Sequence, residues 1–364
     1  MRPDPVPHPT TAVAAAPPLR ARRRRPLSVG RVARGSVPYL LVAPVVIAIG
    51  TILGYPLYHL VTLSFQRYGL PELIQHHGEW IGLDNYRSVL SDHVFWDTLV
   101  RTLVFTAVNV ALTMVVGLLI ALLLVRLAPV VRVVLMTGLV LVWAMPAVVA
   151  VQVWYWMTNF QNGVVNYILT ELHVGDFEQH DWYATTFSKL AMVTLLIVWG
   201  ALPFVAISLY AGLAQVPHEL VEAARIDGAS PWRVFRDITF PVIRPIVFIL
   251  TSLAIIWDFG VFTQPYLLIG ASHVDSSNYL MGVYVYIEGY SHSDFGRGAA
   301  ISILMLLIVA ALSVVYVRGR VRQEELACAR CRHPRARARR GAGAARGAVR
   351  GAAAGTSSGS RCSC

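Results

Sequence analysis

The stretch AAISILMLLIVAALSVVYV, residues 299–317, contains no charged side chain. A bilayer core about 30 Å thick is crossed by about 20 apolar helical residues, because no water is present there to bond exposed backbone groups. Five other runs in the chain have comparable length and are nearly as apolar. The six runs are residues 37–65, 98–125, 133–157, 188–212, 242–264 and 299–317. The sequence therefore predicts an all-α, polytopic membrane protein with six transmembrane helices, in preference to a soluble protein with a buried helical core.

The composition excludes two other classes. The chain has 56% hydrophobic and 14% charged residues, whereas a soluble domain carries about 25% charged residues, which argues against a cytosolic enzyme. The net charge of +11 taken alone suggests a nucleic-acid binder. That charge belongs to the ends, because residues 1–36 hold eight Arg and one acid, residues 327–364 hold nine Arg and no acid, and the body between them is net acidic. We therefore expect no nucleic-acid partner.

The loops between the predicted spans orient the chain in the bilayer. Loops 66–97, 158–187 and 265–297 together carry three Arg and twelve acids, whereas loops 126–132 and 213–240 carry five Arg. Basic loops stay in the cytoplasm, so we expect both termini to be cytoplasmic.

Two basic segments flank the predicted membrane domain of residues 37–322. These segments are residues 1–36 and 323–364. Residues 1–36 and 327–364 are rich in Ala, Arg, Pro or Gly and cannot bury a core, so we expect them to be disordered. The second segment holds all four cysteines, with Cys328 and Cys331 as a CxxC pair and Cys362 and Cys364 as a CxC pair. Although zinc sites use such pairs, nothing between them looks able to fold around a metal, and we predict no metal site.

The cytoplasmic loop 213–241 is the most informative part of the chain. It reads QVPHELVEAARIDG over residues 215–228 and ASPWRVFRDITFP over residues 229–241. Pro217 suits a first helical position, Gly228 a C-terminal cap, and Ser230-Pro231 the N-cap and first position of a second helix. The sequence thus predicts two short helices joined by an elbow, which serves either as a docking surface or as an ordinary amphipathic connector.

This loop resembles the EAA loop of bacterial ABC-importer permeases, whose pattern is E-A-A, three residues, G, nine residues, I, one residue, L-P. The chain has Glu222-Ala223-Ala224, Gly228, Ile238 and Pro241 at those spacings, with Phe240 in place of the Leu. In that family the loop docks the ATPase subunit. The residues to which the resemblance assigns docking are Glu222, Ala223, Ala224, Arg225, Asp227, Gly228, Ile238 and Pro241.

The likeness extends over residues 37–322 and is closest to sugar-importer permeases of the MalF type. The weaker matches lie in the order that those permeases have. They are Gly82-Leu83-Asp84-Asn85-Tyr86, Asn162 to Asn166, Trp199, Ala211-Gly212-Leu213 and Ile226 to Ser230. The loop after the fifth span departs from the group, with Ile269-Gly270-Ala271-Ser272 where a Gly-Gly-Pro is common.

The resemblance implies an ABC type I importer-like permease in the inner membrane of a bacterial cell. It also implies the partners: a second permease subunit, two ATPase subunits, and an extracytoplasmic solute-binding protein that delivers a sugar. The only lysine of the sequence, Lys189, follows Ser188 rather than Gly, so a Walker A loop is absent. We therefore expect no catalytic residue and no bound cofactor in this chain, with ATP and Mg²⁺ held by the partner ATPase.

Polar and aromatic residues deep within the spans are candidates for the substrate path, because sugars are held by hydrogen bonds and by aromatic rings against their apolar faces. The candidates are Asn109, Gln152, Trp154, Trp199, Trp257, Asp258 and Gln264. Asp258 is the most informative, since a carboxylate within a span faces a cavity or a partner. A structural hydrogen bond is the alternative for Asp258, and packing or an interfacial position is the alternative for the tryptophans.

Three other functions are open at this point. An ion-coupled secondary transporter needs coupling carboxylates and usually a repeated half, but the spans show one acid and no obvious repeat. A membrane enzyme needs clustered acids or metal ligands, and the only candidates lie in loop 158–187: Glu171, His173, Asp176, Glu178, His180 and Asp181. We interpret these as a solvated surface near the binding-protein dock. The third alternative is a permease subunit of an ABC importer that carries a polyol or a sugar phosphate.

Overall fold

The computed structural model describes residues 41–270 and 275–344, and the side chains of the last helix up to residue 319. The chain divides into two units, residues 1–58 and 59–364, and each is considered by itself. In the first unit the described residues form one apolar helix with a π-helical turn, η1 (Gly50–Gly54), which continues into α2 (Tyr55–Ser64). The whole of the predicted basic segment 1–36 and residues 37–40 of the first predicted span lie outside the described residues.

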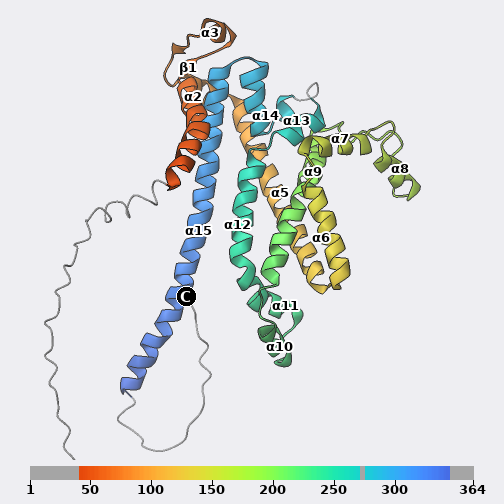
Figure 1. Cartoon of the computed structure of the whole chain (residues 1–364), viewed down its shortest axis with the longest axis vertical. Helices are drawn as coiled ribbons and strands as arrows, with labels where there is room; N and C mark the ends of the chain where they lie inside the picture. The colour runs from red at the N-terminus through yellow and green to blue at the C-terminus, as the bar shows by residue number, and fades with distance from the viewer. Residues whose placement is uncertain (1–40, 271–274, 345–364) are drawn as a thin grey trace, which may run out of the picture. The chain divides into compact units, whose positions relative to one another are not determined.

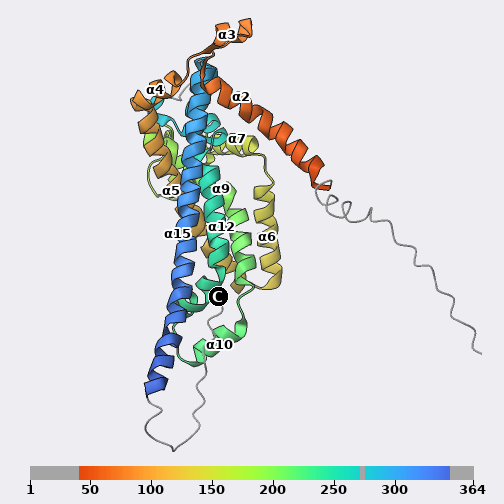
Figure 2. The ribbon, with the colours of Figure 1, turned by 90° about the vertical axis from the view of Figure 1, so that its left-hand side faces the viewer.

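Three long helices form the centre of the second unit: α5 (His93–Arg126), α9 (Thr186–Leu213) and α12 (Phe240–Phe259). Figures 1 and 2 show α9 and α12 running side by side. Local sequence fixes where two of them begin. Asp92 caps α5 by accepting a hydrogen bond from the Val94 amide (2.9 Å), and Thr185 caps α9 by accepting from the Ser188 amide (3.2 Å). Apolar side chains from all three helices fill the space between them.

The third predicted span, 133–157, is broken. Its residues form α6 (Pro129–Trp143) and α7 (Ala147–Met157), which meet at an angle of 100°. Pro146 explains the break, because proline lacks an amide hydrogen, cannot continue the α-helical bonding and disfavours α geometry at the residue before it. The predicted span is therefore built from two helices, and the pair can still act as one span.

Among the described residues, five helices are long and apolar enough to cross a membrane, or six if the bent pair α6–α7 is one span. Together with the helical content this confirms the predicted all-α, polytopic fold class. The described exception is a two-residue antiparallel pairing of β1 (Gln66–Arg67) with β2 (Glu79–Trp80) in the loop after the first span. That loop also contains α3 (Leu70–Gln75) and α4 (Asp84–Ser91).

Short helices cover the two ends of the central bundle (Figure 1). One end carries α10 (His218–Ile226) and α11 (Pro231–Val234), followed by a π-helical turn, η2 (Phe235–Thr239). The opposite end carries α7, α8 (Val164–Glu171), α13 (Thr263–Ile269) and α14 (Met281–Tyr286). The 3-10 turn η4 (Ser276–Asn278) precedes α14, and the π-helical turn η5 (Ile287–Ser291) follows it.

The last helix, α15 (Phe295–Ala344), begins at a partly buried ion-pair network. Arg297 binds Asp92 at the start of α5 and Glu288 in η5, the latter at 3.2 Å. The backbone of α15 remains helical well beyond the predicted boundary at residue 323. The helix includes residues 327–344, for which we expected disorder; Ala, Arg, Gln and Glu are strong helix formers and need no buried core to favour a helix.

Candidate functional site

The loop 213–241 folds as the predicted elbow. α10 ends in a Schellman motif: the Gly228 amide donates to the Arg225 carbonyl oxygen (3.0 Å) and the Ala229 amide to the Ala224 carbonyl oxygen (2.9 Å). Gly228 has a φ of +76°, a conformation that non-glycine residues rarely adopt. Ser230 then caps α11, accepting from the Arg233 amide (3.4 Å), with Pro231 at its first position. Pro217 is the N-cap of α10 rather than its first helical residue.

Helix α10 has no buried residue, so both of its faces are accessible in this chain. His218, Val221, Glu222 and Arg225 line a cavity of about 620 Å³ beneath the elbow, together with apolar side chains near the end of α5. The opposite face presents Ala223, Asp227 and Ile226, whose side chain is 86% exposed. The residues with an assigned docking role therefore divide between an inner face with Glu222 and Arg225 and an outer face with Ala223 and Asp227, while Ala224 is half-buried.

The second half of the elbow leads directly into the bundle. Val234 is buried, Ile238 is half-buried in η2, and Pro241 lies exposed in the first turn of α12. Sequence reasoning missed the π-helical turn η2. The structure thus places Ile238 and Pro241 at the joint between the elbow and α12, some distance along the chain from the exposed face of α10.

A cavity of about 480 Å³ lies between the α6–α7 break, α9 and the end of α12. Four predicted substrate-path residues line it: Trp199, Trp257, Asp258 and Gln264. Three further aromatic residues, Trp143, Phe204 and Phe262, line it as well and were not predicted. The rings of Trp143 and Phe204 form a row with Trp257, with centroids 6.3 Å apart for Trp143–Phe204 and 5.9 Å for Phe204–Trp257. No Arg, Lys or His is among the described residues that line this cavity.

Asp258 is the one carboxylate of this cavity. It is 8% exposed and lies one residue before the end of α12. No hydrogen bond or ion pair joins its side chain to another residue of the described part of the chain. It also lines a smaller cavity of about 20 Å³ with Thr113 of α5. A desolvated carboxylate of this kind is available to accept hydrogen bonds from a ligand.

The other three predicted residues lie outside the cavity. Asn109 is fully buried in α5, where its Nδ2 donates to the Phe105 carbonyl oxygen (2.8 Å) and to Thr194 Oγ1 (3.4 Å). Trp154 packs against Trp199, with ring centroids 6.0 Å apart. Gln152 is exposed on α7. The structure therefore separates the seven candidates into four that line the cavity, one that packs against its wall (Trp154), one buried within α5 (Asn109) and one exposed on α7 (Gln152).

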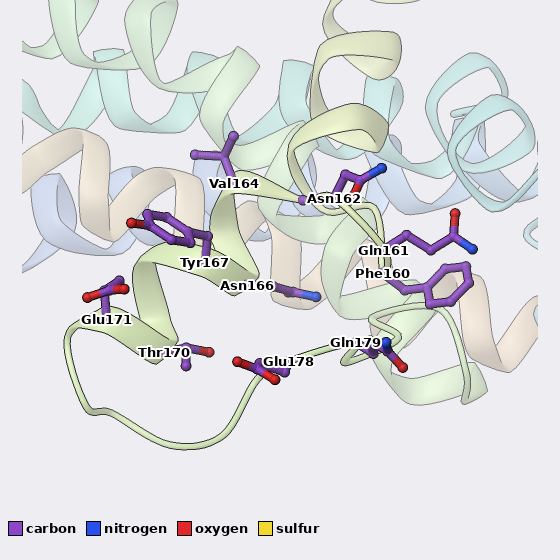
Figure 3. A pocket seen from close by; sticks show the side chains of 11 residues that line it. Phe160, Gln161, Asn162, Val164, Asn166, Tyr167, Thr170, Glu171, Glu178 and Gln179 are labelled. Carbon is purple, nitrogen blue, oxygen red and sulfur yellow. The ribbon is translucent and has the colours of Figure 1, made fainter.

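Loop 158–187 forms a separate, polar pocket of about 540 Å³ (Figure 3). Its side chains come from the loop before α8, from α8 itself and from the following loop, and they include Glu171 and Glu178. Asn166 is held at its base, donating to the His180 carbonyl oxygen (2.9 Å) and accepting from Trp182 Nε1 (2.5 Å).

The other polar groups of this loop stabilise its turns. Asp176 accepts from the Glu178 amide (3.1 Å) and Asp181 from the Tyr183 amide (2.8 Å). Burial raises the pKa of Tyr183 to about 12, and its hydroxyl shares a hydrogen bond with Thr158 (2.7 Å). No group of three or more His, Cys, Asp or Glu among the described residues is arranged to hold a metal ion. The cysteine side chains lie outside the described residues.

Residues 113–322 match the model of the family described as binding-protein-dependent transport system inner membrane component. Diacetylchitobiose uptake system permease protein DasB of Streptomyces coelicolor is 47% identical over 79% of this chain and 88% of its own length. Trehalose/maltose transport system permease protein MalF of Thermococcus litoralis is 32% identical over 67% of this chain and 81% of its own.

The fold is also similar to a solved structure. A chain of a bacterial ABC transporter involved in the import of the acidic polysaccharide alginate superimposes with a TM-score of 0.69 at 18% identity. The match covers 80% of this chain and 97% of that one. At this identity the likeness concerns the fold alone.

Proposed function

The chain belongs to the family of binding-protein-dependent transport system inner membrane components, and from this premise we propose that it serves an ATP-driven importer whose cargo is a neutral sugar. It is a permease subunit that resides in the membrane. The chemical class of the cargo has to be inferred from the site. The cavity between the α6–α7 break, α9 and α12 carries the proposal.

The chemistry of this cavity favours a neutral saccharide. A row of aromatic rings, Trp143, Phe204 and Trp257, offers flat apolar surfaces for the C–H faces of a sugar ring. Asp258 and Gln264 offer hydrogen-bonding groups for its hydroxyls. With a carboxylate and no lining cation, the cavity disfavours a carboxylated sugar or a sugar phosphate. The names of the two relatives, which concern diacetylchitobiose, trehalose and maltose, support the same class.

We assign ATPase docking to the elbow formed by α10, Gly228 and α11. Helix α10 is exposed on both faces and rigidly ended by its Schellman motif, as suits a knob that enters a groove on another subunit. The elbow continues through η2 into α12, whose far end holds Trp257 and Asp258. Movement of the elbow is thereby passed along a single helix to the wall of the cavity.

The complete importer requires further subunits. We propose one second permease subunit, two ATPase subunits and an extracytoplasmic solute-binding protein, with both termini of this chain and the elbow on the cytoplasmic side. The ATPase subunits hold ATP and Mg²⁺, and this chain contributes no catalytic residue. Closure of the ATPase dimer on ATP shifts the permease from an inward-facing to an outward-facing state, so ATP and sugar bias one equilibrium.

Reconstitution tests this assignment. Proteoliposomes that contain the permease pair, its ATPase and its binding protein should take up labelled maltose or diacetylchitobiose. They should do so only when ATP is present on the side of the membrane on which the ATPase is bound. Uptake of a sugar phosphate or a carboxylated disaccharide in preference to neutral sugars would contradict the assigned cargo. Uptake driven by an ion gradient without the ATPase would contradict the importer assignment itself.

A further inference from the structure

One face of α5 carries a line of buried polar residues, of which one, Asn109, is among the predicted substrate-path residues. They are Thr98, Thr102, Thr106, Asn109 and Thr113. Successive members are three or four residues apart, so at about 100° per residue they fall within a sector of roughly 80°. All five are at least nine-tenths buried, with exposed fractions from 0% to 5%. We call this line the α5 polar face.

Several atoms of the α5 polar face are buried without a hydrogen-bond partner. They are the hydroxyl oxygens of Thr98, Thr106 and Thr113 and the amide oxygen Oδ1 of Asn109. Thr102 is different, because its hydroxyl donates to the Thr98 carbonyl oxygen (2.7 Å) and accepts from the Met281 amide (3.0 Å). Burying a polar group without a partner is unfavourable, so a run of such groups is best accounted for by a second state that satisfies them.

The α5 polar face ends at the cavity that we assign to the sugar. Thr113 and Asp258 line one small cavity together, and Asp258 also lines the large one. From Thr98 to Thr113 the helix rises about 22 Å, at 1.5 Å per residue. The α5 polar face therefore leads from the end of the bundle that carries α14 down to the cavity.

Residues 276–281 cover the α5 polar face near the start of α5, and hydrogen bonds hold them there. Arg101 donates to the carbonyl oxygens of Ser276 (3.1 Å) and Tyr279 (3.0 Å), next to the Thr102–Met281 bond. Such bonds can be exchanged for bonds to water with little net change in free energy.

The other half of α5 is packed differently. A Cβ added at Gly117 would lie 2.7 Å from Val205 Cγ1 of α9, and Ala121 is fully buried among apolar side chains. Separating α5 from its neighbours in this half exposes apolar surface to water, which is unfavourable. The first half buries apolar side chains too, among them Phe95, Leu99 and Phe105, so what distinguishes it is the line of polar groups placed between the helices.

We propose that the α5 polar face forms one wall of the extracytoplasmic part of the sugar passage in the outward-facing state. This inference rests on the proposed function, and it names residues of the passage that are covered in the present conformation. In the outward-facing state the segment 276–281 separates from α5. The unpaired oxygens then bond to water and to the hydroxyls of a neutral saccharide on its way to Asp258.

Accessibility of engineered cysteines distinguishes this proposal from simple helix packing, in which threonines serve as polar contacts between helices. The background is the complete importer with the four tail cysteines of this chain replaced by Ser. Thr106→Cys is the test position. Ala121→Cys is buried on α5 in its other half, and Val108→Cys is 45% exposed on another side of α5. A membrane-impermeant methanethiosulfonate is added on the extracytoplasmic side, without nucleotide and after trapping with ATP and vanadate.

We expect Thr106→Cys to react about tenfold faster or more in the trapped state, whereas the two control positions remain unchanged. Equal reactivity in both states, in a preparation that still shows ATP-driven uptake and vanadate trapping, would overturn this inference and leave the proposed function intact. Loss of ATP-driven uptake in the background importer itself would instead count against the proposed function. If the Thr106→Cys importer fails to assemble, Thr113→Cys is judged by the same two outcomes.

Substitutions that keep the shape of the side chain give a second readout. Thr106→Val removes the hydroxyl with little change in volume, and Thr106→Ser keeps it. We expect Val to lower sugar uptake several-fold with ATPase attachment unchanged, and Ser to restore it. Wild-type uptake by the Val variant would contradict a role for the hydroxyl in the passage.

Discussion

The docking elbow and the cavity are built in opposite ways. The elbow is one continuous stretch, residues 217–234, whose helix ends are fixed by its own caps and by Gly228. The cavity is assembled from the α6–α7 break, α9 and α12, which bring Trp143, Trp199 and Asp258 together from distant parts of the sequence. The elbow is exposed and can be altered with little cost to the core, whereas each side chain of the cavity also supports the packing around it.

The comparison indicates a division of labour along α12. Its first residues continue from the elbow and its last residues contribute Trp257 and Asp258 to the cavity. Changes in the elbow should therefore abolish coupling for every cargo, while changes in the cavity should depend on the cargo.

Gly228→Val should abolish ATP-driven uptake. Valine at a φ of +76° is strained by about 1–2 kcal/mol or more, so the Schellman end of α10 is lost and the elbow changes shape. Since a Cβ at Gly228 meets no atom within 4 Å, the effect comes from the backbone and not from a clash. Gly228→Asn is the matched control, because asparagine tolerates positive φ. Retention of both ATPase co-purification and uptake in the Val variant would contradict the docking role.

Asp258→Leu should reduce sugar uptake roughly tenfold to a hundredfold, because a ligand hydroxyl left without its hydrogen-bond partner in a buried site costs about 1–3 kcal/mol. Asp258→Asn keeps the shape of the side chain and part of its hydrogen bonding, so its uptake should fall less. ATPase co-purification should be normal in both variants, in contrast to Gly228→Val. The account of the cavity fails if the Leu variant transports the neutral sugar at the wild-type rate.

Trp257→Ala should lower uptake about threefold to tenfold, because the contact of an aromatic ring contributes about 0.5–1.5 kcal/mol beyond its area. Trp257→Phe keeps an aromatic ring next to Phe204, so its uptake should be close to that of the wild type. The initial rate of uptake at several sugar concentrations measures the effect in both variants. An Ala variant that is impaired equally for sugar and for an unrelated polyol cargo would indicate a packing role instead.

Arg236→Ala should have the smallest effect. In η2 the Nε atom of Arg236 lies 3.4 Å from Oδ1 of Asp237, and both side chains are more than half exposed. This ion pair therefore contributes at most about 1 kcal/mol to stability. We expect unchanged uptake and unchanged ATPase attachment by co-purification. A large loss would show that charge at η2, rather than the shape of α10 and Gly228, governs docking.

The same contrast explains what could be predicted from the sequence. The elbow was predictable because Gly228, Ser230 and Pro231 act on their own backbone. The break at Pro146 was present in the sequence, but the long apolar run around it favoured a single helix. The helical extension of α15 was missed because a composition that cannot form a core can still favour a helix.

The cavity was predicted only in part, since its lining depends on contacts between helices. Asn109 and Asp258 are both polar residues within apolar runs, yet packing buries one against Thr194 and leaves the other facing a cavity. Trp143 and Phe204 carried no signal that separates them from aromatic residues of the core or of the membrane interface.

The coupling between the two regions is tested most directly by the ATP hydrolysis rate of the reconstituted importer with and without sugar-loaded binding protein. We expect the loaded binding protein to stimulate hydrolysis in the wild type, to stimulate it less in Asp258→Leu, and to leave it at the basal rate in Gly228→Val. Full stimulation in the Gly228→Val importer would contradict transmission from the elbow along α12 to the cavity.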